Sequence, residues 1–277
     1  MSANKSKPQI SVIMPVFNSA LFLNKSIESI LNQSFKNFEF IIIDDGSTDT
    51  SLSIINSYSL LDKRIKLVKN KINYGICHTL NRGLLMAKGQ YVARMDADDW
   101  SYPDRLLKQL QFMKSHTEVV ICGGDIDVCN KNLAGINTRQ YPTSDKKIRE
   151  KIFRLNPFAH SAVIYKKNIV LSVGGYNKNF AGAEDYELYF RLGKVGKFAN
   201  LSQKLLKLRT HSSSISAKSI TRQAKLNLYL RLKAAMEYGY KFSLLDKLFL
   251  CFNILGIWLI PSFMQFTVFN FFRRFQK

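Results

Sequence analysis

Arg94-Met95-Asp96-Ala97-Asp98-Asp99-Trp100 is the stretch of sequence that decides the fold. It ends a strand-like run that starts at Gln90, and it places three carboxylates within four residues. Packing does not explain these carboxylates, because desolvating an unpaired aspartate costs several kcal/mol and neighbouring like charges raise one another's pKa. A divalent cation would remove both penalties, and Mg²⁺ and Mn²⁺ prefer oxygen ligands. An acidic turn that caps the next helix is the structural alternative.

The residues before this stretch alternate between strand-like and helical patterns. Four short apolar runs are typical of buried strands: Ile10 to Pro15, Phe38 to Ile43, Ile65 to Val68 and Gln90 to Met95. Helices are expected between them, the first capped by Ser19, because apolar residues recur there at helical spacing. Such alternation predicts a parallel sheet, which binds ligands at the carboxyl ends of its strands. We therefore expect Pro15 to Asn18, Asp44 to Thr48 and Asp96 to Asp99 to converge at one edge.

The half of the chain after Trp100 alternates less regularly, which predicts a mixed sheet in an α/β fold. The expected elements are helices from Pro103, over Lys146 to Leu155 and over Glu184 to Leu192, strands over Val119 to Cys122 and Ser161 to Tyr165, and irregular or hairpin structure over Gly123 to Arg139. Residues 1–215 are expected to form the main domain, and residues 216–277 a helical, basic and hydrophobic C-terminal region.

Charge and composition narrow the classes of protein. The net charge of +21 and the pI of about 9.8 imply an anionic partner: nucleic acid, a phosphorylated ligand or anionic lipid. No nucleic-acid motif accompanies the basic residues, so we expect no nucleic-acid partner. The four cysteines lack metal-binding or CxxC spacing, which is typical of reduced thiols. The polar first eight residues do not resemble a secretory signal.

The C-terminal region contains an uncharged run from Leu248 to Phe272, with basic residues on both sides. A bilayer crossing takes about 20 apolar residues, but polar residues and Pro261 interrupt this run. The favoured interpretation is one or two helices that lie in the headgroup region of an anionic leaflet. A spanning or re-entrant segment and a soluble packing helix, such as a dimer contact, stay open.

Several ordered motifs together resemble the family 2 glycosyltransferases, which have the Rossmann-like GT-A fold. They are Ser11 to Asn18, Ile43 to Asp49, Asp96 to Asp99, Ala183 to Leu188 and Leu208 to His211. The resemblance covers roughly residues 9 to 215, and it implies an inverting transfer of a sugar from a nucleotide-diphosphate sugar to an acceptor hydroxyl. Processive members carry a Gln-x-x-Arg-Trp motif, which is absent here, so we expect transfer of a single sugar.

The resemblance also implies the donor site. Asp98 is the expected ligand of a divalent metal, Mn²⁺ or Mg²⁺, and His211 an additional nitrogen ligand; a surface histidine is the alternative for His211. Asp96 is expected to bind hydroxyls of the donor, with Asp99 assisting. Asp45 is expected to hydrogen-bond the base. Further residues expected to line the nucleotide sugar are Pro15, Val16, Phe17, Asn18 and Ala97.

An inverting reaction needs one general base, because the acceptor attacks in line from the face opposite the leaving group. By the family's Glu-Asp motif we expect Asp185 to be this base, with Glu184 as the neighbouring alternative and helix capping as the structural one. His160 lies where the family often carries a histidine near the acceptor pocket; a structural histidine is the alternative. Arg94 and Lys71 are candidates for phosphate contacts.

These residues predict a hexosyltransferase whose donor, by analogy with the family, is a UDP-sugar and whose acceptor is lipid-linked or a surface polysaccharide. We expect it in the cytoplasm, peripheral on the inner face of the membrane, and a homo-oligomer stays open. The alternative from another class is a catalytically inactive GT-A domain that serves as a binding scaffold in a polysaccharide assembly complex.

Overall fold

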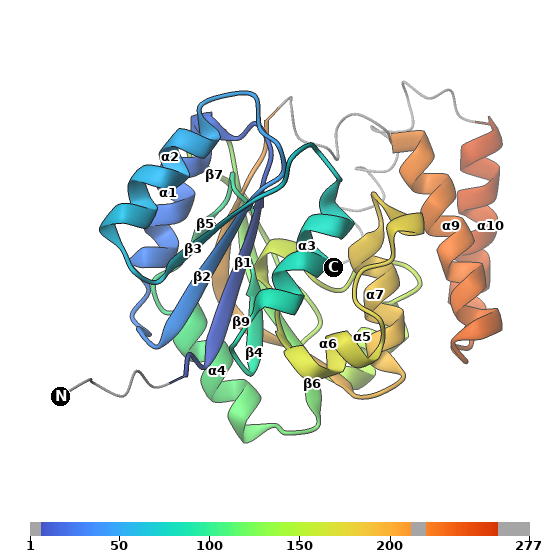
Figure 1. Ribbon diagram of the computed structural model, residues 1–277. Helices are drawn as coiled ribbons and strands as arrows, with labels where there is room; N and C mark the ends of the chain where they lie inside the picture. The colour runs from blue at the N-terminus through green and yellow to red at the C-terminus, as the bar shows by residue number, and fades with distance from the viewer. Residues whose placement is uncertain (1–6, 212–219, 260–277) are drawn as a thin grey trace.

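The computed structural model describes residues 7–211 and 220–259. One mixed sheet runs through the described part of the chain (Figure 1). Its strands are β1 (Ile10–Val16), β2 (Phe38–Asp44), β3 (Ile65–Lys69), β4 (Tyr91–Arg94), β5 (Trp100–Ser101), β6 (Val119–Cys129), β7 (Gly135–Arg139), β8 (Ile164–Lys166) and β9 (Lys197–Arg209). They follow the order β3-β2-β1-β4-β8-β6-β9-β5, with β7 beside β6.

The first half of the sheet is parallel, as the alternating pattern predicts. β1 pairs in parallel with both β2 and β4, and β2 pairs in parallel with β3. The chain thus moves outward from β1 in one direction to β3 and then returns to β4 on the other side. This reversal makes the carboxyl ends of β1 and β4 a topological switch point, where open α/β sheets bind ligands.

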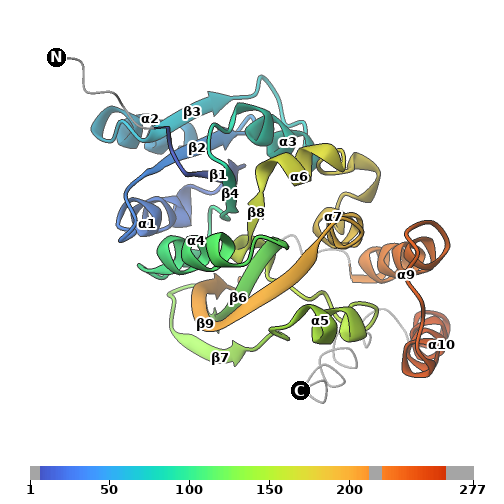
Figure 2. The same ribbon diagram turned by 90° about the horizontal axis from the view of Figure 1, so that it is seen from below.

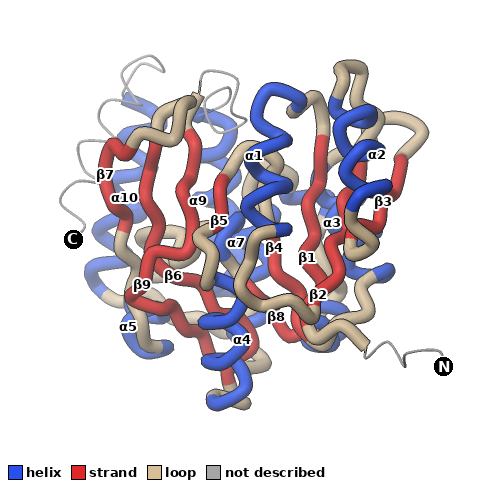
Figure 3. The backbone as a smooth tube through the Cα atoms, turned by 90° about the vertical axis from the view of Figure 1, so that its left-hand side faces the viewer, coloured by secondary structure: helices blue, strands red, loops and turns tan. Residues whose placement is uncertain are grey.

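Helices cover both faces of the sheet, which explains why β1 and β2 are almost continuously apolar. The helices are α1 (Ala20–Leu31), α2 (Ser51–Leu61), α3 (Ile76–Met86), α4 (Arg105–Ser115), α5 (Asp145–Lys151), α6 (Lys167–Ser172), α7 (Glu184–Gly193), α9 (Ile220–Glu237) and α10 (Leu244–Leu259). Residues of α1, α2 and α4 share one buried cluster. Residues of α3, α5, α6, α7 and α9 share a second cluster on the opposite face (Figures 2 and 3).

The second half of the sheet departs from the sequence-based expectations. The strand predicted to stop at Cys122 continues to Cys129; the hairpin that it forms with β7 is one of the two structures expected over Gly123 to Arg139. The predicted strand over Ser161 to Tyr165 begins as a 3₁₀ turn, and only its end is extended. The helix predicted to reach Leu155 ends at Lys151. β9 was not predicted at all, because its register against β6 shifts between Leu201 and Lys204 and this shift breaks the two-residue period.

Ser19 occupies the N-cap position of α1, but its side chain does not cap the helix as predicted. Its hydroxyl donates to the carbonyl oxygen of Phe17 (3.1 Å). The carboxylate of Asp49 instead accepts a hydrogen bond from the Ala20 N–H (3.0 Å). The start of α1 is therefore fixed by the loop that precedes α2.

The helices α9 and α10 pack side by side beyond α7, at the side of the molecule farthest from α1 and α2 (Figures 1 and 2). The predicted boundary at residue 215 and the second half of the uncharged run, residues 260–272, lie outside the described residues. Among the helices in the described ranges, none has the length and apolarity that crossing a membrane requires.

Candidate active site

The loops after β1 and β2 are joined at the edge of the sheet by Asn18. Its side-chain oxygen accepts from the N–H groups of Thr48 (2.8 Å) and Asp49 (3.3 Å), and its own N–H donates to Ser47 Oγ (3.0 Å). Asn18 has a φ of 47°, a left-handed conformation that asparagine tolerates better than most residues. Beside it, the Phe17 ring is 46% exposed and faces solvent rather than the core.

The carboxylate of Asp45 is buried and holds the turn before α3. It accepts hydrogen bonds from Asn70 Nδ2 (2.6 Å) and from the N–H groups of Gly75 (2.9 Å) and Tyr74 (3.1 Å). At Gly46 next to it, an added Cβ would lie 2.6 Å from the backbone of the facing loop, so this turn requires glycine. The structure thus places Asp45 at the expected edge, while its contact with a base stays a prediction.

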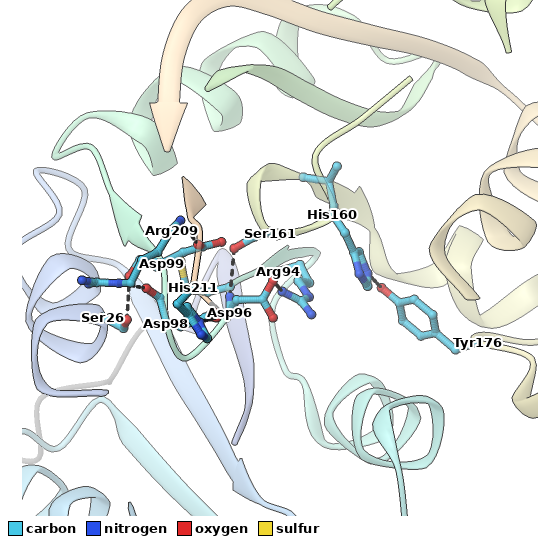
Figure 4. A network of polar contacts seen from close by, with 12 residues as sticks. Ser26, Arg94, Asp96, Asp98, Asp99, His160, Ser161, Tyr176, Arg209 and His211 are labelled. Atoms are coloured by element: carbon cyan, nitrogen blue, oxygen red, sulfur yellow. Dashed lines mark hydrogen bonds and ion pairs between the residues drawn. The ribbon is translucent and has the colours of Figure 1, made fainter. Parts of the chain in front are cut away.

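Asp96, Asp98 and Asp99 form one cluster after β4 (Figure 4). Each offers a carboxylate oxygen within 4.8 Å of the others. Asp99 is buried and accepts from the N–H of Arg209 at the end of β9 (2.9 Å), while Arg209 Nε donates to the carbonyl oxygen of Asp98 (2.6 Å). The Asp96 N–H donates to Ser161 Oγ (2.9 Å). Two distant segments therefore fix the backbone that carries the carboxylates.

His211, the expected additional metal ligand, lies against Asp98. Its Nε2 is 2.9 Å from Asp98 Oδ2, and both side chains are partly exposed. Two ligands at right angles, each about 2.1 Å from a metal ion, are about 3 Å apart, so this pair has the spacing of neighbouring ligands. Burial, and then the charge of Asp96, raise the pKa of Asp98. The donor set and the crowded negative charge both fit a divalent cation.

Arg94 connects this cluster to the start of α7. Its side chain is 5% exposed and forms an ion pair with Asp96. The same cation lowers the pKa values of Glu184 and Asp185, although burial outweighs it at both positions. Arg94 therefore pairs with the aspartate cluster, and its charge also acts on the expected general base. Because its observed partner is Asp96, a contact between Arg94 and phosphate stays a prediction.

Asp185 lies in the first turn of α7 and is held from two sides. It accepts from Asn156 Nδ2 (2.9 Å) and from the N–H of Tyr186 (2.7 Å). Burial raises its pKa, and the bond from Asn156 opposes this rise. The neighbouring Glu184 has its pKa raised to about 7 by burial and by the charge of Asp185. Near neutral pH, Glu184 can thus carry a proton beside the Asp185 carboxyl group.

His160 lies near Arg94, on the side away from the aspartate cluster, and its ring is hydrogen-bonded within the protein (Figure 4). Its Nε2 lies 2.9 Å from the hydroxyl of Tyr176, which lies 3.2 Å from that of Tyr165. Burial and the charge of Arg94 keep the pKa of His160 well below its usual value, so the ring is neutral. Asn81 fixes the backbone of Tyr176 through two hydrogen bonds (2.7 and 2.8 Å).

Four residues of this site escaped the sequence analysis: Asn156, Ser161, Tyr176 and Arg209. Ser161 follows His160 and Arg209 lies within the Leu208 to His211 motif, while Asn156 and Tyr176 adjoin residues typical of turns, Pro157 and Gly175. Proximity in sequence to such a motif is the signal that points to them, but it does not reveal which partner each one contacts.

Comparison with known proteins places the chain in a family. The model of glycosyl transferase family 2 matches residues 11–172. The O-antigen biosynthesis glycosyltransferase WbnJ of Escherichia coli is 35% identical over 209 residues, which cover 74% of this chain and 81% of WbnJ. This chain therefore belongs to glycosyl transferase family 2, and it is a glycosyltransferase.

Two solved structures show the same GT-A fold. S. aureus TarS 1-349 in complex with UDP-GlcNAc has a TM-score of 0.69 at 19% identity, covering 93% of this chain and 77% of that one. The mannosyltransferase PcManGT from Pyrobaculum calidifontis, in complex with GDP-Man and Mn²⁺, has a TM-score of 0.61 at 14% identity, covering 99% and 82%. The predicted GT-A sheet flanked by helices is thus confirmed.

Proposed function

We propose that this protein is an inverting hexosyltransferase that moves one sugar from a UDP-sugar to a hydroxyl of a lipid-linked or surface-polysaccharide acceptor. One observation carries the proposal: Asp98 and His211 meet at the carboxyl edge of the sheet, where Arg94 pairs with Asp96. The O-antigen biosynthesis relative supports a polysaccharide acceptor, and the TarS complex with UDP-GlcNAc supports a UDP-sugar.

In the proposed donor site, Asp98 and His211 would hold a divalent cation, Mn²⁺ or Mg²⁺, and Asp96 would bind hydroxyls of the donor. The cation would neutralise the charge that develops on the diphosphate leaving group. The base of the nucleotide would lie beside the exposed Phe17 ring, above the turn that the Asp45 carboxylate holds. The remaining contacts with the nucleotide sugar would come from four residues: Pro15, Val16, Asn18 and Ala97.

In the proposed transfer step, the carboxylate of Asp185 takes the proton of the acceptor hydroxyl. The acceptor oxygen then bonds to the anomeric carbon as the bond between that carbon and the diphosphate breaks, which inverts the configuration. Glu184, with its pKa raised to about 7, can retain a proton near neutral pH, which removes a repelling charge beside Asp185. His160, which is neutral, and Tyr176 contact each other and form a polar surface next to Arg94.

We further propose that the protein works at the inner face of the membrane, where lipid-linked acceptors lie. The net charge of +21 supports this location, since each basic residue near an anionic leaflet contributes about 1 kcal/mol of attraction. Residues 216–277 would form the membrane-associating region.

A donor panel tests the proposed function. The purified protein is incubated with UDP-, GDP- and dTDP-sugars, with Mn²⁺, Mg²⁺ or EDTA and with acceptor lipid extract, and release of nucleoside diphosphate is measured. We expect release from a UDP-sugar that requires the cation and the extract. Release from no donor, together with no donor binding in a thermal-shift assay, would instead favour the inactive scaffold.

A further inference from the structure

The helix α10 has two opposite faces. Asp246, Leu250 and Asn253, spaced at helical period, are buried toward the rest of the molecule. The opposite face consists of apolar side chains that are 50–74% exposed, here named the outer stripe: Leu244, Leu245, Leu248, Phe252 and Leu255. Single exposed apolar residues are ordinary, but a continuous stripe on one helix marks an interaction surface.

The buried face of α10 is fixed to the domain by polar contacts. Asp246 Oδ1 accepts from Arg154 Nε (2.9 Å), and Asp246 Oδ2 accepts from the N–H and the hydroxyl of Ser243 (2.9 and 2.6 Å), which caps the helix. The Arg231 guanidinium lies 5.1 Å from the centre of the Phe249 ring. These contacts set the rotation of α10, so its outer stripe points away from α9 and the sheet.

The charges around the outer stripe are basic. Lys241 and Lys247 are exposed beside it. The two acids of this helix pair are already engaged: Asp246 is buried against Arg154, and Glu237 pairs with Lys233 (3.0 Å). The sequence that follows, residues 260–277, is rich in Phe and contains three basic residues and no acid. Apolar side chains flanked by lysines match an anionic lipid surface, which offers both a hydrocarbon boundary and negative charge.

We propose that the outer stripe of α10 inserts into the interface of an anionic bilayer and anchors the enzyme there. The inference deepens the proposed function, because it names the surface that brings the site to lipid-linked acceptors. The stripe belongs to a helix that is packed on the domain, so docking would hold the whole domain in one orientation on the membrane.

A paired substitution tests the proposal in the full-length protein. Flotation with phosphatidylcholine vesicles, with and without phosphatidylglycerol, is measured for wild type, for Leu248→Gln/Phe252→Gln, and for a matched control, Leu60→Gln/Leu61→Gln. The control residues are 86% and 83% exposed on α2, at the opposite side of the molecule. We expect the α10 variant to lose about tenfold or more in partitioning onto anionic vesicles, and the control to stay within about twofold.

Charge is tested by Lys241→Gln/Lys247→Gln, which should weaken binding to anionic vesicles and flatten its dependence on salt. Unchanged flotation of the α10 variant would overturn the proposal, as would equal losses in the control. Conversion of an oligomer to a monomer by the α10 variant, with vesicle binding intact, would overturn it too, since the stripe would then be a contact between copies. Donor binding, measured in parallel by thermal shift without vesicles, separates failure of this inference from failure of the proposed function.

Discussion

Replacing Asp185 by asparagine removes the proposed general base while preserving its shape. The amide oxygen of the variant can still accept from the N–H of Tyr186, whereas its NH₂ group faces the NH₂ group of Asn156. Asn156 must turn over or lose this hydrogen bond, which costs about 1 kcal/mol. Because this cost is small and the hydrogen bond from Tyr186 is kept, the variant should fold and bind donor nearly as wild type does.

The chemical effect should be much larger than this structural effect. Loss of a positioned base typically lowers the rate about 10²–10⁴-fold. At 1.36 kcal/mol for each factor of ten, this range corresponds to about 3–5 kcal/mol in the barrier. The difference between the two estimates lets kinetics distinguish a base from a helix cap.

The assay compares kcat for sugar transfer at saturating donor and Mn²⁺, together with the donor concentration at half-maximal thermal shift. We expect kcat to collapse in Asp185→Asn with little change in donor binding, while the neighbouring Glu184→Gln stays within about tenfold of wild type. Transfer by Asp185→Asn within about tenfold of wild type would refute the assignment. A collapse confined to Glu184→Gln would move the role to Glu184.

Three further perturbations probe the charges of the site. His211→Ala should raise the Mn²⁺ concentration for half-maximal transfer about tenfold or more. The control is His116→Ala, which replaces an exposed histidine at the C-terminal end of α4 and should not change that concentration. Equal effects of the two substitutions would contradict the assignment of His211 as a metal ligand. Arg94→Gln removes a cation that lowers the pKa of Asp185, so the acid limb of the kcat profile should move to higher pH; an unmoved limb would count against this coupling. The pKa of Glu184 is about 7 in the folded protein, against an ordinary value of 4.5. Between these pH values the folded wild type therefore binds more protons than the unfolded chain. Its free energy of unfolding should fall by up to about 3 kcal/mol as pH rises from 4.5 to 7. Glu184→Gln lacks this loss and should be the more stable protein at pH 8, with the difference shrinking toward pH 4.5; urea unfolding at both pH values shows whether it does.

The parallel half of the fold follows from the sequence because local and global signals agree there. Apolar runs such as Phe38 to Ile43 are buried on both faces, and each ends in polar residues that the topology brings to one edge. β9 carries no such signal. Its register shifts against β6, and its partner strand lies far away in sequence, so only the completed sheet defines it.

The site shows the same division between local and long-range information. A cluster at Asp96 to Asp99 can be recognised from its position after a strand. His211, more than a hundred residues later, was expected from the family motifs alone to be a metal ligand; the structure places it against Asp98, and its binding of a metal stays a prediction. The hydrogen bonds that occupy Asp45 could not be predicted, because they come from the loop before α3 and depend on how closely Gly46 lets that loop approach.

The account rests on acidic side chains and one histidine that hold a cation and its diphosphate at the edge of the sheet. The most direct test is a crystal structure with UDP and Mn²⁺, in which an anomalous difference map locates the metal. We expect one peak at about 2.0–2.3 Å from an Asp98 oxygen and from His211 Nε2, with the diphosphate on its open side. A metal bound elsewhere, or UDP bound while Asp98 and His211 keep their direct contact, would contradict the account.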